Sequence, residues 1–245
     1  MYEKIKSLAK QYYPETVAIR RDLHKYPEQG WLEMRTASLV AKKLEKLGYQ
    51  VLIGKEIMCE EYRMGVPDQE TLESNYQRAI LQGADPYYIK KVKDGFTAVA
   101  GILKNGSGPV VAIRFDMDAL CIEEYDSINH NPGKFGFISC NQGTMHACGH
   151  DGHVAIGLTV AKILSNIKDS IQGTIKLIFQ PAEEGVRGAK SICKSGILKD
   201  VDYIFAGHIW QQEANEDYDI YLGMNETFAT TKLDVIYHGV SSHAA

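Results

Sequence analysis

The chain has 245 residues, with 27 lysines and arginines against 31 aspartates and glutamates, and so a net charge of −4. Its 44% hydrophobic and 24% charged residues are ordinary for a globular protein and exclude a disordered or fibrous chain. No segment has the basic stripe typical of nucleic-acid binding. The N-terminal segment is charged throughout, and the longest apolar stretch, 154–164, is too short to cross a bilayer. We therefore expect a cytoplasmic protein with neither a nucleic-acid nor a membrane partner.

The five cysteines are odd in number and lack the spacing of a disulfide framework, which suits a reducing compartment. We expect four of them to be buried and unpaired, as free cysteines usually are. Cys148 is the exception, because its neighbours in the sequence are polar.

The first part of the chain predicts two helices. Apolar residues recur at helical spacing over 15–47 and are interrupted by the segment KYPEQGW, so we expect a helix from Glu15, a turn, and a second helix from Arg35 to Gly48. Residues 49–53 are β-prone and predict a short strand.

The segment 56–93 is polar and helix-forming. It predicts a helical insertion on the surface, with an N-cap at Asp68 and a break at 83–86. A direct chemical role for this insertion is the less favoured alternative.

The remainder predicts an α/β fold, in which a central mixed sheet has helices on both faces. An amphipathic helix is expected over 151–167. Four apolar runs have the composition of buried strands, namely 97–103, 109–115, 174–179 and 202–206.

A second domain is expected near the end of the chain. From Thr227 a new β-type segment begins, and the sequence ends on SSHAA directly after a strand pattern. We expect residues 1–226 to form one domain and 227–245 to be the truncated beginning of another.

Polar residues gather where the strand-like runs end. Sites in open α/β sheets form in the crevice outside the carboxyl ends of the strands. Three runs are followed by Asp116 and Asp118, by Glu183 and Glu184, and by His208. A fourth cluster, MHACGHDGH, precedes the helix and supplies His146, Cys148, His150, Asp151 and His153.

Each cluster also has a structural explanation. The two aspartates are equally well explained as caps, the glutamate pair as a solvated turn, and His208 as a packed histidine. CGHDGH is harder to explain in this way, because a thiolate, two imidazoles and a carboxylate within six residues are metal ligands. The four clusters together predict a metal site.

The adjacent glutamates suggest a mechanism. Neighbouring residues on an extended segment point to opposite sides, so one glutamate can bind metal while the other acts as general base on a metal-bound water. Cys148 would bind as a thiolate. Asp118 could orient a ligand from behind.

Five motifs together resemble the amidohydrolase branch of the M20 metallopeptidase family, over nearly the whole chain: MHACGHDGH, FQPAEEG, RFDMDAL, GHIW and RRDLHKYPEQGWLEMRTA. The resemblance implies a zinc-peptidase-like catalytic domain over 1–226 and the start of a small α+β lid or dimerisation domain from 227. It also implies one or two divalent cations, Mn²⁺ or Zn²⁺. The expected reaction is hydrolysis of an amide between an aroyl or acyl group and an amino acid.

The family's functional residues are carried over position by position. Glu183 matches the general base, and the metal ligands match Cys148, His150, Glu184 and His208. His243 matches a histidine at the start of the lid, which in the family stabilises the oxyanion in a neighbouring active site. His146 and His153 match motif positions that we do not expect to be ligands.

The insertion resembles that of family members acting on p-aminobenzoyl-glutamate, so we expect this substrate first. The alternatives are a general N-acyl-amino-acid amidohydrolase with aromatic acyl preference, a non-catalytic subunit, or a metal-binding fragment. The expected partner is a second copy or a related subunit.

The chain departs from the family pattern. The lid and a last histidine ligand are missing, Phe115 stands where a small residue is commoner, and QQEANED follows GHIW. We expect the 245-residue chain alone to be essentially inactive and its longer parent to be active.

Overall fold

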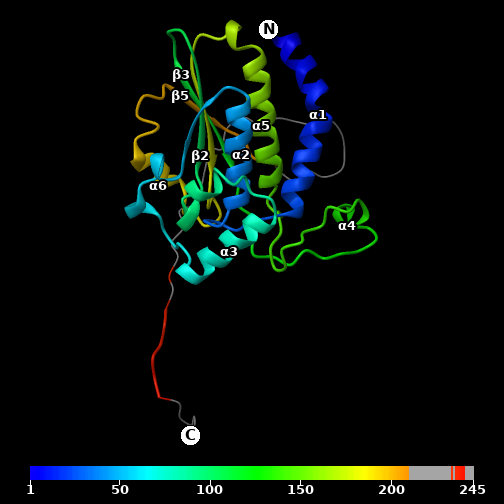
Figure 1. The fold of residues 1–245 in the computed structure, drawn as a ribbon, viewed down its shortest axis with the longest axis vertical. Coiled ribbons are helices and arrows are strands. Elements are labelled where there is room, and N and C mark those ends of the chain that lie inside the picture. The colour runs from blue at the N-terminus through cyan, green and yellow to red at the C-terminus, as the bar shows by residue number, and fades with distance from the viewer. Residues whose placement is uncertain (210–232, 234, 241–245) are drawn as a thin grey trace. The chain divides into compact units, whose positions relative to one another are not determined.

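A computed structural model describes residues 1–209, 233 and 235–240 (Figure 1). The α-helices are α1 (Tyr2–Lys25), α2 (Met34–Lys46), α3 (Gln69–Leu81), α4 (Asn131–Lys134), α5 (His150–Asn166) and α6 (Ala189–Ser195). The strands are β1 (Gln50–Ile53), β2 (Val99–Asn105), β3 (Val110–Asp116), β4 (Gly173–Gln180) and β5 (Tyr203–Ala206). Short 3₁₀ helices span Gly54–Glu56, Glu60–Tyr62, Ile89–Lys91, Lys93–Gly95 and Lys168–Ser170.

The chain divides into two units, 1–211 and 212–245. The predicted domain boundary at 226/227 lies outside the described residues, and of the predicted lid segment only 233 and 235–240 are described, with no strand assigned to them. No helix in the described part is long and apolar enough to span a membrane.

All five strands form one mixed sheet, as predicted, and their order in it is β1-β2-β4-β3-β5. β3 runs parallel to both β4 and β5, whereas β2 is antiparallel to β1 and β4. Asp116 pairs with Gln180, so β3 and β4 end side by side. Val99 pairs with Phe179, which places the beginning of β2 beside the end of β4.

Helices cover the sheet on both faces, as expected. α1, α2 and α5 lie over one face and α6 over the other (Figure 1). Successive residues of β4 divide between the two cores: Leu177 and Phe179 belong to the larger, and Ile178 to the smaller, which also contains Trp31 and Ile192. The period-2 alternation of a strand buried on both sides explains this division.

α1 is longer than predicted, because it begins at Tyr2 and not at Glu15. Residues 1–14 are mostly exposed, so this part of the helix needs no apolar stripe and gives no periodic signal. Pro14 lies within the helix.

The insertion contains the predicted helix α3, and its predicted cap is confirmed because Asp68 Oδ1 accepts a hydrogen bond from the Thr71 amide at 2.8 Å. The insertion is not only a surface element, however. Ile57 belongs to the smaller core and Leu72 to the larger, so its flanks help to close both.

The expectation of four buried cysteines is wrong. Cys121, Cys140 and Cys193 are exposed, Cys59 is half-buried, and all are free thiols. Cys121 and Cys140 lie in the loops around α4, outside the packed layers, and Cys193 lies on the outer side of α6.

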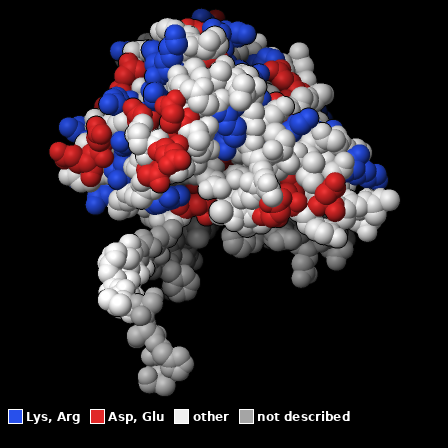
Figure 2. Space-filling model, turned by 60° about the horizontal axis from the view of Figure 1, so that its bottom comes forward, with Lys and Arg blue, Asp and Glu red and all other residues white. Residues whose placement is uncertain are grey.

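Basic and acidic side chains are interspersed over the face turned forward in Figure 2, among the residues the structure describes. This distribution agrees with the near balance of charges in the sequence.

Candidate metal centre

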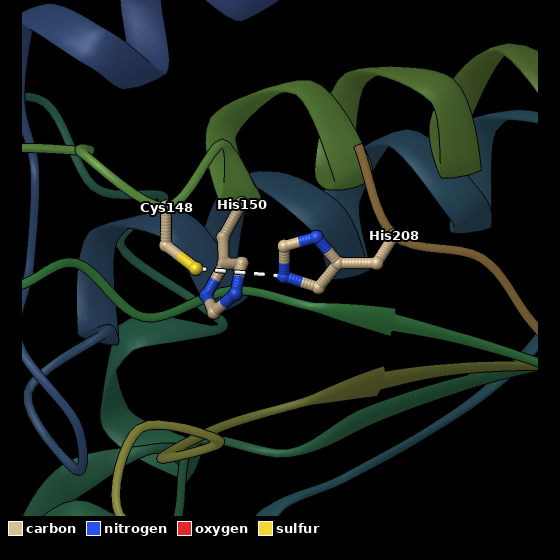
Figure 3. Close-up of side chains that lie close together, drawn as sticks. All are labelled: Cys148, His150 and His208. Atoms are coloured by element: carbon tan, nitrogen blue, oxygen red, sulfur yellow. Dashed lines mark hydrogen bonds between the residues drawn. The ribbon is translucent and has the colours of Figure 1, made fainter. Parts of the chain in front are cut away.

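Three of the four predicted ligands, Cys148, His150 and His208, lie together at the edge of the sheet where β3, β4 and β5 end and α5 begins (Figure 3), and Glu184 lies within reach of His150. Cys148 Sγ lies 3.4 Å from His208 Nε2, and the rings of His150 and His208 are 5.6 Å apart in an edge-on arrangement. Gly149, between Cys148 and His150, has φ +89°, a conformation that favours glycine. This bend lets both side chains point toward His208.

Hydrogen bonds fix which nitrogen of His150 is free. Its Nδ1 lies 2.8 Å from the carbonyl oxygen of Asp118. A carbonyl oxygen only accepts, so Nδ1 is the protonated nitrogen and the Nε2 lone pair is free in the neutral ring. Nε2 is buried and has no hydrogen-bond partner in the described part of the chain.

Ile209 fixes two further histidines. His208 Nδ1 donates to the carbonyl oxygen of Ile209 at 2.7 Å, which leaves His208 Nε2 free to face Cys148. The amide of Ile209 donates to His153 Nε2 at 3.0 Å, so that lone pair is used. His153 lies with Asp116 and His150 in a possible ligand group, but its remaining Nδ1 carries the proton. This geometry agrees with the expectation that His153 is not a ligand.

The two glutamates lie in a turn and not on an extended segment, so the predicted geometry is wrong. Ala182, Gly185 and Val186 have φ of +49°, +80° and +58°. The amides of Glu183 and Glu184 both donate to the Asp118 carboxylate at 2.9 Å. The two side chains still lie within reach of His150 as one possible ligand group, because the buried aspartate holds the turn in place of a strand ladder.

Asp118 thus contacts both His150 and the glutamate turn, and its role in orienting a ligand stays a prediction. Burial raises its pKa, but the hydrogen bonds from His150 and from the amides of Glu184 and Glu183 outweigh that effect and hold the pKa below its ordinary value. The side chain remains an anion behind His150.

Glu33 holds Ala182, the residue before the two glutamates in the same turn. Glu33 was not identified from the sequence. Its carboxylate accepts from the Ala182 amide at 2.8 Å and from the Thr97 hydroxyl at 2.7 Å, and it is fully buried. Burial, helped by the charge of Asp118, raises the pKa of Glu33 to about 8. The available signal was a single acid in the apolar stretch WLEM.

Glu183 has the environment of a proton acceptor. Its Oε2 lies 3.8 Å from His150 Nε2, and its side chain is 33% exposed. Burial and the charge of Asp116 raise its pKa, partly opposed by His150. Asp116 itself is buried, accepts from Arg114 at 3.0 Å and caps no described helix.

The donor set fits a divalent cation. Sulfur, imidazole nitrogen and carboxylate oxygen are its ligands, and Glu184 Oε1, like His150 Nε2, is buried without a hydrogen-bond partner among the described residues. Without a cation, burial and the carboxylates of Glu184, Glu183 and Asp118 raise the pKa of Cys148 to about 12. A thiolate at this position therefore needs a positive charge beside it.

A buried network supports the start of α5 from behind. His24 Nδ1 contacts Asp151 at 2.8 Å and His24 Nε2 contacts Glu124 at 2.9 Å. His146 is also buried, and burial lowers its pKa to about 4, so it is neutral. His243 lies outside the described residues.

The sequence of residues 112–241 matches the model of the peptidase family M20/M25/M40. The chain belongs to this family, as the motifs predict. It is 44% identical over 243 residues to the A-type subunit of p-aminobenzoyl-glutamate hydrolase from Escherichia coli, a match that covers 99% of this chain and 55% of the relative. It is 46% identical over 236 residues to indole-3-acetyl-aspartic acid hydrolase of Enterobacter agglomerans, covering 96% and 54%. The chain thus spans about half the length of the curated relatives it matches.

Solved structures agree with the fold. An aminobenzoyl-glutamate utilization protein from Klebsiella pneumoniae superposes with a TM-score of 0.72 at 41% identity, over 84% of this chain and 46% of the other. A dinuclear metal-binding peptidase of the M20 family from Bacillus subtilis gives 0.60 at 30% identity, over 81% and 44%. The α/β architecture is therefore that of M20 peptidases.

Proposed function

We propose that the protein catalyses metal-dependent hydrolysis of the amide bond between an aromatic acyl group and an amino acid. The observation that carries this proposal is the convergence of a thiol, two imidazoles and two carboxylates at the ends of β3, β4 and β5. A pure binding module has no need of Glu183 beside such a ligand set, which argues against the non-catalytic alternatives.

Four residues would hold the metal, namely Cys148, His150, Glu184 and His208. One or two cations are expected, manganese or zinc, because the thiol favours zinc whereas the carboxylates also accept manganese. A cation held there supplies Lewis-acid polarisation of the amide carbonyl and acidifies water.

Glu183 would move the proton. Its raised pKa brings the carboxylate closer to the pKa that suits general base catalysis near neutral pH. It accepts a proton from the attacking water at a carboxylate oxygen and returns it to the nitrogen of the leaving amino acid.

The first candidate substrate is p-aminobenzoyl-glutamate, since the Escherichia coli relative is named for its hydrolysis. An indole-acetyl conjugate of aspartate is the second candidate, because a relative of similar identity is named for it. Both names combine an aromatic acyl group with an acidic amino acid.

Product release from a panel of acyl-amino acids tests the proposal in the complete protein loaded with manganese or zinc. We expect p-aminobenzoate and glutamate to be released with the highest kcat/KM. Absence of hydrolysis across the panel, at confirmed metal occupancy, would refute the function.

The assembly and location are also proposals. Two relatives are named as one subunit of p-aminobenzoyl-glutamate hydrolase or its homolog, which supports a second, related polypeptide in the enzyme, and a homodimer is the alternative. Light scattering of the complete protein, by itself and mixed with that related polypeptide, distinguishes them. We further propose that residues from 227 begin the lid, that His243 stabilises the oxyanion, and that the free thiols reflect a cytoplasmic location.

A further inference from the structure

Arg187 has a positive charge that no acid neutralises in the described part of the chain. Its Nε donates to the carbonyl oxygen of Glu184 at 3.1 Å and its Nη1 to that of Gly65 at 3.3 Å, and the residue is half-buried. By contrast, Arg114 pairs with Asp116 and Arg63 lies near Glu60. Nη2 of Arg187 donates to no acceptor among the described residues.

The guanidinium occupies a cradle that two glycines leave open. A Cβ atom at Gly30 would lie 2.6 Å from Nη2, and one at Gly65 would lie 3.3 Å from Cδ of the same side chain. Trp31 Nε1 donates to the carbonyl oxygen of Met64 at 2.9 Å, which ties the two glycine segments together. The arginine is thus held by the insertion on one side and by the turn of the glutamates on the other.

We propose that Arg187 binds the side-chain carboxylate of an acidic amino acid in the leaving group. This inference rests on the proposed function and names the specificity within it. Arg187 lies three residues from Glu184 in the chain, and its Nε is bonded to the main chain of that ligand. A guanidinium presents paired N–H donors that match a carboxylate, whereas an amide side chain offers no such charge. The two relatives named for hydrolysis of glutamate and aspartate conjugates agree with this chemistry.

The test compares p-aminobenzoyl-glutamate with p-aminobenzoyl-glutamine in the complete, metal-loaded protein. We expect the native protein to prefer the glutamate conjugate by about 30- to 100-fold in kcat/KM. R187Q should remove most of that preference by lowering kcat/KM for glutamate while leaving the glutamine conjugate within about threefold. R187K keeps the positive charge but loses the paired N–H donors of the guanidinium. It should retain an intermediate preference for the glutamate conjugate.

K190Q is the matched control, because Lys190 also carries a positive charge near this segment but stacks over Tyr62 on the outside. It should keep the native preference. A second readout is competitive inhibition by glutarate, which R187Q should weaken by about tenfold or more.

The ratio of the two kcat/KM values is internal to each variant, so a general loss of activity does not imitate the effect. Equal losses for both conjugates in R187Q and R187K, or no preference in the native protein, would overturn the inference. Such results leave the amidohydrolase function standing, whereas inactivity of the native protein on both conjugates would count against that function itself.

Discussion

Glu183 is the residue whose contacts bear most directly on chemistry. It stands 3.8 Å from His150 and is held through its main chain by Asp118, so its side chain is free for proton transfer. Glu183→Gln keeps the shape of the side chain and removes the proposed base. We expect kcat to fall by about 10²- to 10⁴-fold, with KM and metal content unchanged. Steady-state kinetics with elemental analysis checks this, and full turnover by the variant would exclude Glu183 as the base.

The buried contacts of His24 should make the free energy of unfolding depend on pH. Burial lowers the pKa of His24, but the hydrogen bonds to Asp151 and Glu124 outweigh burial and raise it above the ordinary value. The charged form therefore favours the folded state. Its stabilisation is fully present below the unfolded pKa of about 6.5 and is lost as the pH rises through the raised folded value.

We expect His24→Gln to lower the free energy of unfolding by about 3 kcal/mol at pH 6, and by less at pH 9. Urea unfolding at both pH values measures the difference. His130→Gln is the control, because this more exposed histidine also contacts Glu124 and should cost under about 1 kcal/mol. A His24 effect that grows with pH would contradict the assigned sign.

At the scale of the element, α5 depends on a glycine for its contact with the sheet. A Cβ atom at Gly157 would lie 2.8 Å from the rings of Phe115 and Phe179. Glycine to alanine normally stabilises a helix by about 1 kcal/mol, but overpacking a core costs about 1 to 3 kcal/mol.

We therefore expect Gly157→Ala to lower stability by roughly 1 to 2 kcal/mol and to shift the middle of α5 away from β3 and β4. Gly196, at the end of α6, gives no comparable contact with the core and serves as the comparison, although its φ of +90° adds strain. Denaturant unfolding measures both. A stabilised Gly157→Ala protein would show that the two rings move aside.

The sequence predicts these elements unequally well. β2 and β4 were predictable because they are largely buried and have near-continuous apolar sequences. β3 is only partly buried, and β5, which was also predicted to be buried, is exposed along its length. The first half of α1 was not, because an exposed helix needs no periodic apolar face. The turn after β4 was mistaken for an extended segment, since its positive φ values depend on carboxylates supplied by residues 33 and 118, far away in the chain.

In the candidate metal centre, too, some features are predictable from the sequence and others are not. Clusters such as CGHDGH predict metal ligands from a short stretch of sequence, and the structure brings Cys148, His150 and His208 together. The choice of free nitrogen on each histidine was not predictable, because it depends on the main chain of Asp118 and Ile209. The position of Arg187 was not predictable either, because its partners are the main-chain carbonyl oxygens of Glu184 and Gly65.

At the scale of the whole molecule, metal binding should be coupled to stability. The free donors of His150 and Glu184 are buried without a hydrogen-bond partner among the described residues, and the fold brings them near other candidate ligands, so we expect the folded protein to bind a cation more tightly than the unfolded chain. At free metal 1,000-fold above Kd this coupling adds about 4 kcal/mol.

Removal of metal with a chelator should therefore lower Tm by several degrees and abolish hydrolysis, and added manganese or zinc should restore both. Differential scanning calorimetry with parallel assays measures this. Cys148→Ala should weaken the dependence of Tm on metal. An unchanged Tm after complete metal removal would contradict the coupling.

The direction of β2 has a consequence for how such a site can diversify. Because β2 runs against β4, the chain before β2 arrives at the edge where β3, β4 and β5 end. The segment 57–96 therefore lies beside the candidate metal centre, where the carbonyl oxygen of Gly65 accepts a hydrogen bond from Arg187. The candidate ligands come from other parts of the chain. Sequence changes near Gly65 in this segment would alter the surroundings of Arg187 and leave the predicted metal ligands unchanged.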